Sequence, residues 1–419
     1  MRWPVFPLDK IADVFGGSTP RRNRSEYWDG DIPWVTPTDL PMPGTEIADV
    51  YDTADHITPE GLRSCAANLL PVGTVLYSSR ATIGKIGIAR VPLATNQGFA
   101  NFAPKPGVES KYLAYALQYF TVEISSLAGS TTFKEVRRGA LKKYKVPLPS
   151  PSEQHRIVEI LDQADALRKK RAEADAKAAR ILPALFYKMF GDPATNPKGL
   201  VKKRLGDLIK VRSGNFLPAK NMDSSGHCPV YGGNGINGYH SEYMFEEPVI
   251  VLGRVGIYCG VVHYSEPNCW VTDNALYVAE QSKDLHPRYL AEALRIANLN
   301  QYAGRAGQPL ISGNRIYPIE ILVPPPEEQE KFAGMILELS KYESRRESSG
   351  VHLETLFSVL MHRAFTGDLT AKWRGAHMKE LLQEMEQQAK ALEIDDGRLS
   401  IEKELKSSII DHQSEIIHD

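Results

Sequence analysis

Two long segments of the chain repeat apolar residues at alternating steps of three and four, the spacing of a coiled-coil seam. The first stripe consists of Ile157, Ile160, Ala164, Leu167, Arg171, Ala174, Ala178, Ile181, Leu185 and Met189. The second lies 175 residues further along and consists of Phe332, Met335, Leu339, Tyr342, Arg346, Ser349, Leu353, Leu356, Leu360 and Ala364. The pattern predicts two long helices, at 152–189 and within 326–372.

Breaks and charges inside these helices refine the prediction. Pro183 should kink the first helix or split off its last turn, and Gly350 should weaken the middle of the second. One such helix alone would indicate ordinary packing, but two with matched stripes can pack antiparallel about a pseudo-twofold axis. Arg171 and Arg346 would then lie near the crossing. Because an unpaired buried charge is costly, we expect acidic neighbours to pair with them, the candidates being Glu173, Asp175, Glu343 and Glu347.

The helices are part of an internal duplication. KVPLPSPSEQHRIVEIL begins at Lys145 and EILVPPPEEQEKFAGMI at Glu320, and the same offset aligns Leu185 with Leu360, Phe190 with Phe365 and Gly129 with Gly304. Upstream the match continues with gaps: LDKIADVFGG from Leu8 with LGDLIKVRSG from Leu205, Arg80 with Arg254, and Thr95-Asn96 with Thr272-Asp273. A shared framework with different loops is expected of two copies that recognise different things.

The first part of each copy is rich in strands and turns. β-Branched and aromatic runs bounded by Gly, Pro and Asn predict strands at 73–79 and 85–91 in copy one and at 248–253 and 260–265 in copy two. Helical patches begin at Lys111 and Arg288. The fold class is therefore α+β (mixed): two domains of mixed structure related by a pseudo-twofold and separated by two long antiparallel helices. The predicted boundaries are 1–150, 151–195, 196–325, 326–372 and 373–419.

Charge is unevenly distributed along the 419 residues. The formal net charge is -1, yet residues 375–419 hold 5 Lys and Arg against 11 Asp and Glu, and the rest holds 45 against 40. A mildly basic body is compatible with a nucleic-acid partner. In the acidic tail, the stripe Met378, Leu381, Met385, Ala389 and Leu392 predicts an amphipathic helix that docks on a partner.

Several classes of protein are disfavoured. No stretch approaches the roughly 20 apolar residues of a membrane helix, the N-terminus has no apolar signal segment, and the four cysteines form no CxxC pair. We therefore expect a reduced, cytoplasmic protein with no membrane partner. Neither a GxxxxGK[ST] motif nor HExxH is present, so no enzyme activity is predicted. The GxGxxG match at 233–238 precedes a strand-like aromatic segment, which favours a flexible turn over a nucleotide site.

Several distinctive segments, spread over roughly residues 1–374, occur in the two copies. In copy one they are GGSTPRR from Gly16, YWDGDIPWVTPTDL from Tyr27, LPVGTVLYSSRATIGKIGIA from Leu70, ATNQGF from Ala94, VPLPSPSEQHRIVEIL from Val146 and LFYKMFGDP from Leu185. In copy two they are PVYGGNGINGYHSEY from Pro229, WVTDNALYV from Trp270, VPPPEEQEKFA from Val323 and HRAFTGDLTAKWR from His362. These segments resemble the specificity subunits of type I restriction–modification systems over roughly residues 1–374, and the acidic tail lies outside the resemblance.

The resemblance implies a non-catalytic subunit. Each target recognition domain would read one half of an asymmetric, bipartite sequence in double-stranded DNA, and the helices would set the spacing between the halves. Two methyltransferase (modification) subunits would methylate adenine with S-adenosylmethionine. Restriction or translocase subunits that use ATP and Mg²⁺ could join, and this chain itself would bind no cofactor.

Candidate DNA-binding residues follow from the chemistry of base edges and phosphates. Arg suits guanine, Asn and Gln suit adenine, and Lys and Arg in basic runs suit phosphates. In copy one the candidates are Ser79, Arg80, Thr82, Lys85, Asn96 and Gln97, followed by the basic group Lys134, Arg137, Arg138, Lys142 and Lys143. In copy two they are Tyr231, Asn234, Asn237, Tyr239, Arg254, Asn274, Arg305 and Gln308.

Alternatives stay open for individual residues and for the whole chain. Asn96 and Asn274 can instead satisfy buried backbone groups, and an arginine shared by the two copies at Arg80 and Arg254 favours a framework salt bridge or a phosphate contact over base reading. Arg21, Arg22 and Arg24 form either a solvated loop or a phosphate site. The chain as a whole could instead be a duplicated protein-binding scaffold or a free-standing DNA-binding regulator.

Overall fold

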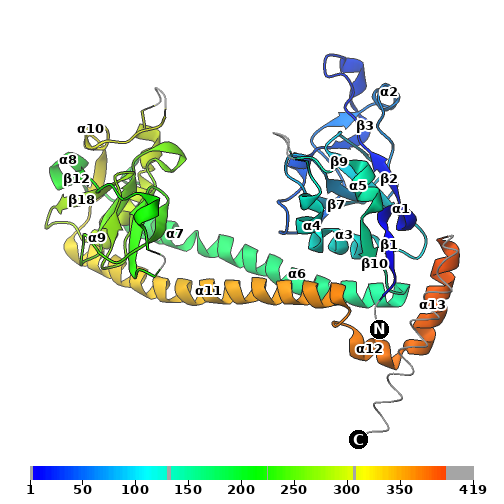
Figure 1. Cartoon of the computed structure of the whole chain (residues 1–419). Helices are drawn as coiled ribbons and strands as arrows, with labels where there is room; N and C mark the ends of the chain where they lie inside the picture. The colour runs from blue at the N-terminus through cyan, green and yellow to red at the C-terminus, as the bar shows by residue number, and fades with distance from the viewer. Residues whose placement is uncertain (1–2, 130–133, 224, 305–307, 393–419) are drawn as a thin grey trace, which may run out of the picture. The chain divides into compact units, whose positions relative to one another are not determined.

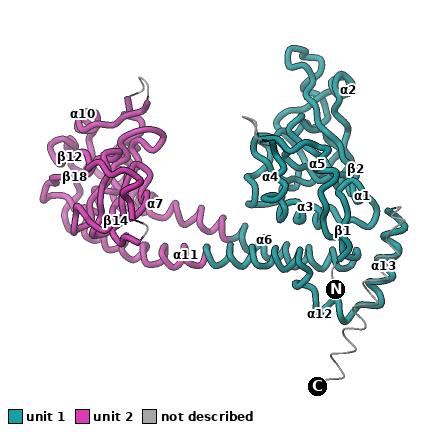
Figure 2. Tube along the Cα trace, in the orientation of Figure 1, with its two compact units in different colours: residues 1–170, 351–419 teal, residues 171–350 magenta. Residues whose placement is uncertain are grey.

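The chain folds into two compact units that divide both long helices between them. The computed structural model describes residues 3–129, 134–223, 225–304 and 308–392 (Figure 1). Unit 1 consists of residues 1–170 and 351–419, and unit 2 of residues 171–350 (Figure 2). Each unit mixes helices with antiparallel and parallel strands, so the predicted α+β class is confirmed.

Unit 1 contains two sheets and a short strand pair. The five-stranded sheet has the order β2 (Ala12–Gly16), β9 (Phe99–Pro104), β6 (Val75–Ser78), β7 (Ile86–Ala89) and β4 (Ala48–Val50). The three-stranded sheet has the order β5 (His56–Ile57), β3 (Trp28–Val35) and β8 (Ala94–Thr95), and β1 (Val5–Pro7) pairs with β10 (Lys145–Pro147). Its short helices are α1 (Leu8–Ile11), α2 (Pro59–Arg63), α3 (Ser110–Tyr119), α4 (Thr121–Ser126) and α5 (Arg138–Lys143).

Unit 2 repeats this strand order without a counterpart of β4, which confirms the predicted duplication. Its four-stranded sheet has the order β12 (Ile209–Ser213), β18 (Ala275–Gln281), β15 (Ile250–Gly253) and β16 (Val262–Tyr264). The three-stranded sheet is β14 (Gly235–His240), β13 (Cys228–Gly232) and β17 (Trp270–Val271), and β11 (Val201–Arg204) pairs with β19 (Glu320–Val323). Its short helices are α8 (Leu205–Leu208), α9 (Pro287–Ile296) and α10 (Gly313–Ile316). The GxGxxG segment turns between β13 and β14, with no helix after it, as predicted.

The repeated Gln of the proline-rich signature explains part of the duplication. In unit 1 the Gln154 amide donates to the carbonyl oxygens of Gly107 (3.0 Å) and Pro149 (2.9 Å) and accepts from the Glu109 N–H (2.9 Å). In unit 2 the Gln329 amide makes the matching three bonds, to Asp284 and Pro324 and from His286. Each glutamine therefore ties the start of a long helix to the loop before α3 or α9, which satisfies buried backbone groups.

The long helices begin close to the predicted positions. The first runs as α6 (Pro151–Ala178), breaks at residues 179–180 and resumes as α7 (Ile181–Phe190), so the interruption predicted from Pro183 is confirmed. Proline is tolerated there because the first turn of a helix leaves its N–H groups unpaired. The second helix, α11, is continuous from Pro326 to Thr366 and passes through Gly350 without a break.

The predicted apolar seam is only partly correct: Ile157, Ala164 and Ala364 are buried as predicted, but Leu161, Phe357 and Met361 take the places assigned to Ile160, Leu356 and Leu360. In unit 1 Ile157, Leu161 and Ala164 of α6 share a core with Phe357, Met361 and Ala364 of α11. The next inward position is Arg168 rather than the predicted Leu167, which is 55% exposed. Arg168 stacks its guanidinium on the Phe357 ring (4.2 Å) and pairs with Glu354 (2.8 Å), so a long polar side chain fills the seam. Tyr342 and Leu356 of the predicted seam are likewise exposed.

Unit 2 contains the predicted arginine crossing. The Arg171 guanidinium donates to the backbone carbonyl of Arg346, and both arginines pair with the Asp175 carboxylate through Nε, at 2.9 Å and 3.2 Å. Asp175 thus plays the role expected of an acidic neighbour. No ion pair joins either arginine to the other candidates, Glu173, Glu343 or Glu347, within the part of the chain that the structure describes.

The C-terminal amphipathic helix docks on this chain's own unit 1, which corrects the prediction of a partner. After α12 (Ala371–Ala376), α13 (Met378–Ala391) buries Leu381 and Met385. Its Gln388 donates to Gly107 O (2.7 Å), and its Glu384 accepts from the Ser152 N–H (3.0 Å) at the start of α6. Burial opposes ionisation of Glu384, but the bonds from Ser152 lower its pKa. The rest of the predicted tail, 393–419, lies outside the described residues.

Candidate nucleic-acid interface

Three loops of unit 1 meet at one end of the five-stranded sheet. They are 79–85 between β6 and β7, 96–98 between β8 and β9, and 134–137 before α5. Backbone bonds hold them together: Ser79 N–H donates to Gly98 O (2.8 Å), Ala81 N–H to Lys134 O (2.9 Å) and Val136 N–H to Ser79 O (2.9 Å). The structure therefore gathers on one surface most of the residues proposed for copy one.

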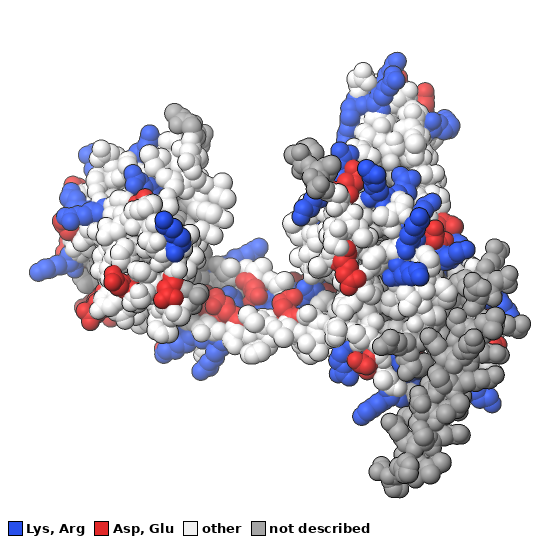
Figure 3. Space-filling model, in the orientation of Figure 1, with Lys and Arg blue, Asp and Glu red and all other residues white. Residues whose placement is uncertain are grey.

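The exposed side chains of this surface can contact a ligand. Gln97, Lys134, Arg137 and Arg138 are exposed, and the Arg80 guanidinium lies 3.8 Å from the carboxylate of Glu135. That pair is half-exposed on both sides and holds the arginine weakly. Lys142 is half-buried and Lys143 exposed in α5, which follows directly. Figure 3 shows Lys and Arg side chains spread over the visible face of unit 1.

Other predicted residues are engaged inside the protein. The Lys85 ammonium donates to the carbonyl oxygens of Pro37 (2.6 Å) and Leu40 (2.9 Å), so it fastens the 37–40 segment. Ser79 is 7% exposed. The half-buried Asn96 accepts from Gly98 N–H (2.8 Å), which agrees with the alternative of backbone support, and the half-buried Thr82 offers its carbonyl to Ser78. These four residues shape the loops.

Unit 2 builds the same loop cluster from different side chains. Arg254 N–H donates to Asn274 O (3.1 Å), Gly256 N–H to Pro309 O (3.0 Å) and Ile311 N–H to Arg254 O (2.9 Å). The Arg254 guanidinium donates from one nitrogen to Ser213 Oγ (3.1 Å) and Asp273 O (3.3 Å). Asn274 and Gln308 are exposed beside it.

The bonding pattern corrects the alignment of the two copies by one residue. Ser79 of unit 1 and Arg254 of unit 2 make the equivalent backbone bonds, and the isolated bridge Arg80–Glu135 corresponds to Val255–Leu310. Arg80 and Arg254 are therefore not equivalent, and the argument that a shared arginine indicates framework does not hold. In the same way Asn96 matches Thr272, not Asp273, because their N–H groups bond to Val35 O and Tyr231 O. The two loop clusters therefore carry different side chains at this position.

The remaining candidates of copy two divide into buried and exposed groups. Tyr231 is 5% exposed in β13 and its hydroxyl accepts from Glu266 N–H (3.0 Å), and burial raises its pKa. It is a core residue. Asn234, Asn237 and Tyr239 are exposed on the hairpin of β13 and β14. Arg305 lies outside the described residues.

Some residues of these surfaces were missed in the sequence. Gly17 and Gly214 directly follow the equivalent strands β2 and β12, and a Cβ on either would overlap carbonyl oxygens at the end of β8 or β17. Thr19 follows the first glycine and donates to Gln97, and Ser213 precedes the second and contacts Arg254. The alignment of Gly16-Gly17 with Ser213-Gly214 is the sequence signal that could have identified these residues.

The arginines of the segment 21–24 are exposed and make local contacts at the surface. The Arg22 guanidinium lies 3.9 Å from the Trp28 ring centroid and pairs with Asp55 at 2.8 Å, while Arg24 lies 3.5 Å from Glu26. Because the Arg22 side chain is 57% exposed, the ring and the carboxylate hold its guanidinium only weakly. Arg21 stays exposed beside it.

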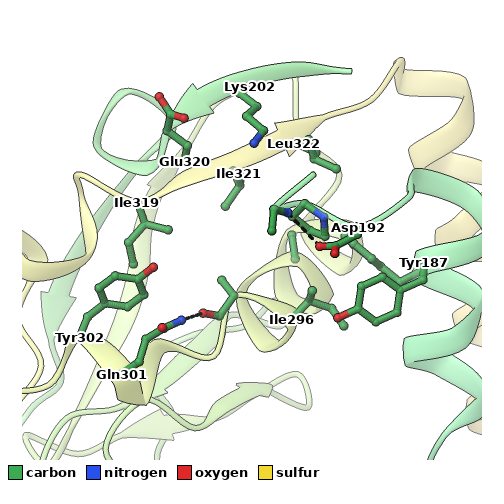
Figure 4. A pocket seen from close by; sticks show the side chains of 15 residues that line it. Tyr187, Asp192, Lys202, Ile296, Gln301, Tyr302, Ile319, Glu320, Ile321 and Leu322 are labelled. Carbon is green, nitrogen blue, oxygen red and sulfur yellow. Dashed lines mark hydrogen bonds between the residues drawn. The ribbon is translucent and has the colours of Figure 1, made fainter. Parts of the chain in front are cut away.

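A pocket of about 300 Å³ in unit 2 lies apart from these loops, between α7, α9, β11 and β19 (Figure 4). None of the predicted residues lines it. It exists because Ile296, Ala297 and Ile319 stand where unit 1 has Tyr119, Phe120 and Tyr144, whose rings pack on one another and on Phe365. Asp192 at its edge accepts from Ala194 N–H (2.9 Å) in a local turn.

The described residues contain no group of three or more His, Cys, Asp or Glu side chains that could hold a metal ion. Among them there is also no helix with the length and apolar character needed to cross a membrane. The loop clusters offer amides, hydroxyls and guanidinium groups, which are donors suited to phosphates and base edges.

The basic residues before and within α5 give a testable expectation. Changing Arg137 and Lys143 to Gln should reduce the slope of log K against log salt for DNA binding by about 0.9 per phosphate contact removed. The measurement is a salt titration of the DNA affinity of the chain. Lys379→Gln, on the exposed side of α13, is the matched control and should leave the slope unchanged. An unchanged slope in the double variant would show that these residues do not contact DNA.

Comparison with known proteins adds to this geometry. The family model described as "Type I restriction modification DNA specificity domain" matches residues 2–175 and 197–345. The type I restriction enzyme MjaIX specificity subunit of Methanocaldococcus jannaschii is 38% identical over 237 residues, which is 52% of this chain but only about half, 54%, of that protein. The EcoprrI specificity subunit of Escherichia coli is 28% identical and covers 79% of this chain and 86% of its own length.

Solved structures resemble this chain in fold. The S subunit of a type I restriction–modification system from M. genitalium superposes with a TM-score of 0.55 at 16% identity, covering 87% of this chain and 96% of that one. A second structure, from work on complex assembly and conformational transition of the type I system, gives a TM-score of 0.54 at 16% identity and covers 88% and 98%.

Proposed function

Since the chain belongs to the type I restriction–modification DNA specificity family, we propose that each of its units reads one half of a bipartite DNA sequence through the loop cluster at the end of its main sheet. The helices α6 and α11 then set the spacing between the halves. Because one chain carries both units, recognition of the two half-sites requires no second copy of the protein.

The observation that carries this proposal is the contrast between framework and loops. The backbone bonds that join the loops recur in both units, but the side chains at equivalent positions differ: Ser79 against Arg254, Arg80 against Val255, and Lys134 against Pro309. Identical readers related by a twofold axis would recognise a palindrome. Different readers on one framework favour two unlike half-sites.

Partner subunits supply the chemistry in this proposal. The long helices carry exposed apolar side chains outside their seam, namely Leu167, Ile181, Tyr187, Leu337, Tyr342, Val351, Leu356 and Val359. We infer that these helices, which carry several exposed apolar side chains, contribute to the surface that partner subunits contact. Two modification subunits that methylate adenine with S-adenosylmethionine fit this role, and restriction subunits that use ATP and Mg²⁺ could join them. This chain would act as the non-catalytic DNA-recognition subunit and hold no cofactor.

The test is to express the chain with its modification subunit and to map methyladenine across a genome. We expect one asymmetric motif with two specified parts and an unspecified gap of fixed length. Methylation independent of this chain would favour the protein-binding scaffold. Tight, specific DNA binding by the isolated chain, without methylation in the complex, would favour the free-standing regulator.

A further inference from the structure

A groove in unit 2 matches a face of unit 1 that α13 covers. The unit 2 groove has a volume of about 390 Å³, and its lining includes Val201, Lys203, Asp284, Pro324, Pro325 and Pro326. The duplication aligns Val201 with Pro4, Asp284 with Gly107 and Pro324 with Pro149. No described residue covers this groove as α13 covers its counterpart: Val201 is 59% exposed, and Pro325 and Pro326 are exposed.

In unit 1, α13 shows how such a face is filled. Met385, Ala389 and Leu392 close over Pro4 and Phe6, leaving a space of only about 10 Å³. Gln388 donates to Gly107 O (2.7 Å) and Pro149 O (3.3 Å), and Glu384 accepts from the start of α6. The covering element is thus an amphipathic helix with apolar side chains and one amide donor on its buried face.

The same acceptors lie in the unit 2 groove. The carbonyl oxygens of Asp284 and Pro324, which correspond to those of Gly107 and Pro149, already accept from Gln329 just as the others accept from Gln154. Each carbonyl oxygen has two lone pairs, so in unit 1 both also accept from Gln388. Among the described residues of unit 2, none donates a second hydrogen bond to Asp284 O or Pro324 O.

Charge distinguishes the occupant of this groove from another copy of α13. Glu327 stands where unit 1 has Ser152, and Glu328 and Glu330 are exposed beside it. Lys203 is already paired with Asp284 at 3.0 Å. A helix with Glu384 would place a carboxylate against Glu327, whereas a helix with Lys or Arg there would pair with it.

We propose that the unit 2 groove binds an amphipathic helix of a modification subunit, with apolar side chains over Val201, an amide donor toward Asp284 O and Pro324 O, and a cation facing Glu327. This inference rests on the proposed function, because it takes the modification subunit as the partner. In unit 1 the chain's own α13 occupies the matching place, so the two units present unlike surfaces to the two partners.

The experiment titrates purified full-length chain with modification subunit and counts bound subunits by native mass spectrometry. The wild type should bind two. Val201→Lys, which puts a charge in the groove, should weaken one of the two sites at least tenfold, and Glu327→Lys should do the same. Val122→Lys is the matched control, because Val122 is an exposed valine (82%) of unit 1 and should behave as the wild type.

A photo-crosslinking amino acid, benzoylphenylalanine, in place of Val201 identifies the occupant. A cross-link to a helix of the modification subunit supports the proposal. A cross-link to residues 393–419 of the same chain, or to a second copy of the chain, overturns it. Full binding of two subunits by Val201→Lys overturns it as well, whereas a wild type that binds no modification subunit would overturn the proposed function itself.

Discussion

Replacing Glu153 with Ala should destabilise unit 1 by about 3–5 kcal/mol, the usual cost of breaking a buried ion pair. The Glu153 carboxylate is almost fully buried, and it accepts from Trp3 Nε1 (2.9 Å), Thr370 Oγ1 (2.6 Å) and Arg374 Nε (2.7 Å). These donors come from the N-terminal segment and from the residues after α11. The variant therefore removes one acceptor from three buried donors at once.

The duplicated signature provides the control. Glu328 occupies the same place in copy two but is exposed, and it has no hydrogen-bonded partner among the described side chains. Glu328→Ala should change the free energy of unfolding by no more than about 0.5 kcal/mol. Chemical denaturation of the full chain, followed by the fluorescence of its tryptophans, measures both. Equal effects of the two substitutions would show that the buried network contributes little.

The duplication and most elements could be predicted from the sequence, because they depend on local patterns. β-Branched runs between Gly and Pro predicted the strands around Val75 and Ile250, and Pro183 predicted the interruption of the first long helix. The pairing of Arg171 and Arg346 with Asp175 followed from the cost of a buried charge. Each of these inferences needs only a short window of residues or a simple physical penalty.

The seam of the helices and the equivalence of loops could not be predicted in the same way. Steps of three and of four are equally compatible with an apolar stripe, and the choice of Arg168 over Leu167 depends on Phe357 and Glu354 of the other helix. Likewise, identical letters aligned Arg80 with Arg254, but the backbone bonds align Ser79 with Arg254 because loop lengths differ.

Which part of the molecule packs against an apolar helix face also depends on the whole fold. The stripe of α13 showed that this helix would bury one side, but nothing in its sequence showed that unit 1 of the same chain would receive it. The structure does gather the candidate residues of copy one at Gly-rich turns at strand ends, and their role in DNA binding stays a prediction. Which of them point outward depended on contacts such as that of Lys85 with Pro37 and Leu40.

Lengthening both long helices should change the spacing of the DNA target and leave its halves unchanged. Four helix-forming residues inserted after Lys169 in α6 and four after Gly350 in α11 add one turn, about 6 Å. Contacts on either side, Arg168 with Glu354 in unit 1 and Arg171 and Asp175 with Arg346 in unit 2, stay within their own units. At about 3.4 Å per base pair, the gap should grow by one to two base pairs.

Genome-wide mapping of methyladenine, with the inserted and the unaltered chains each expressed with the modification subunit, tests most directly whether two unlike readers are held apart by helices. We predict the same two half-sites in both maps, separated by a longer gap in the variant. A variant that methylates different half-sites, or the same motif with an unchanged gap, would contradict the separation of reading from spacing.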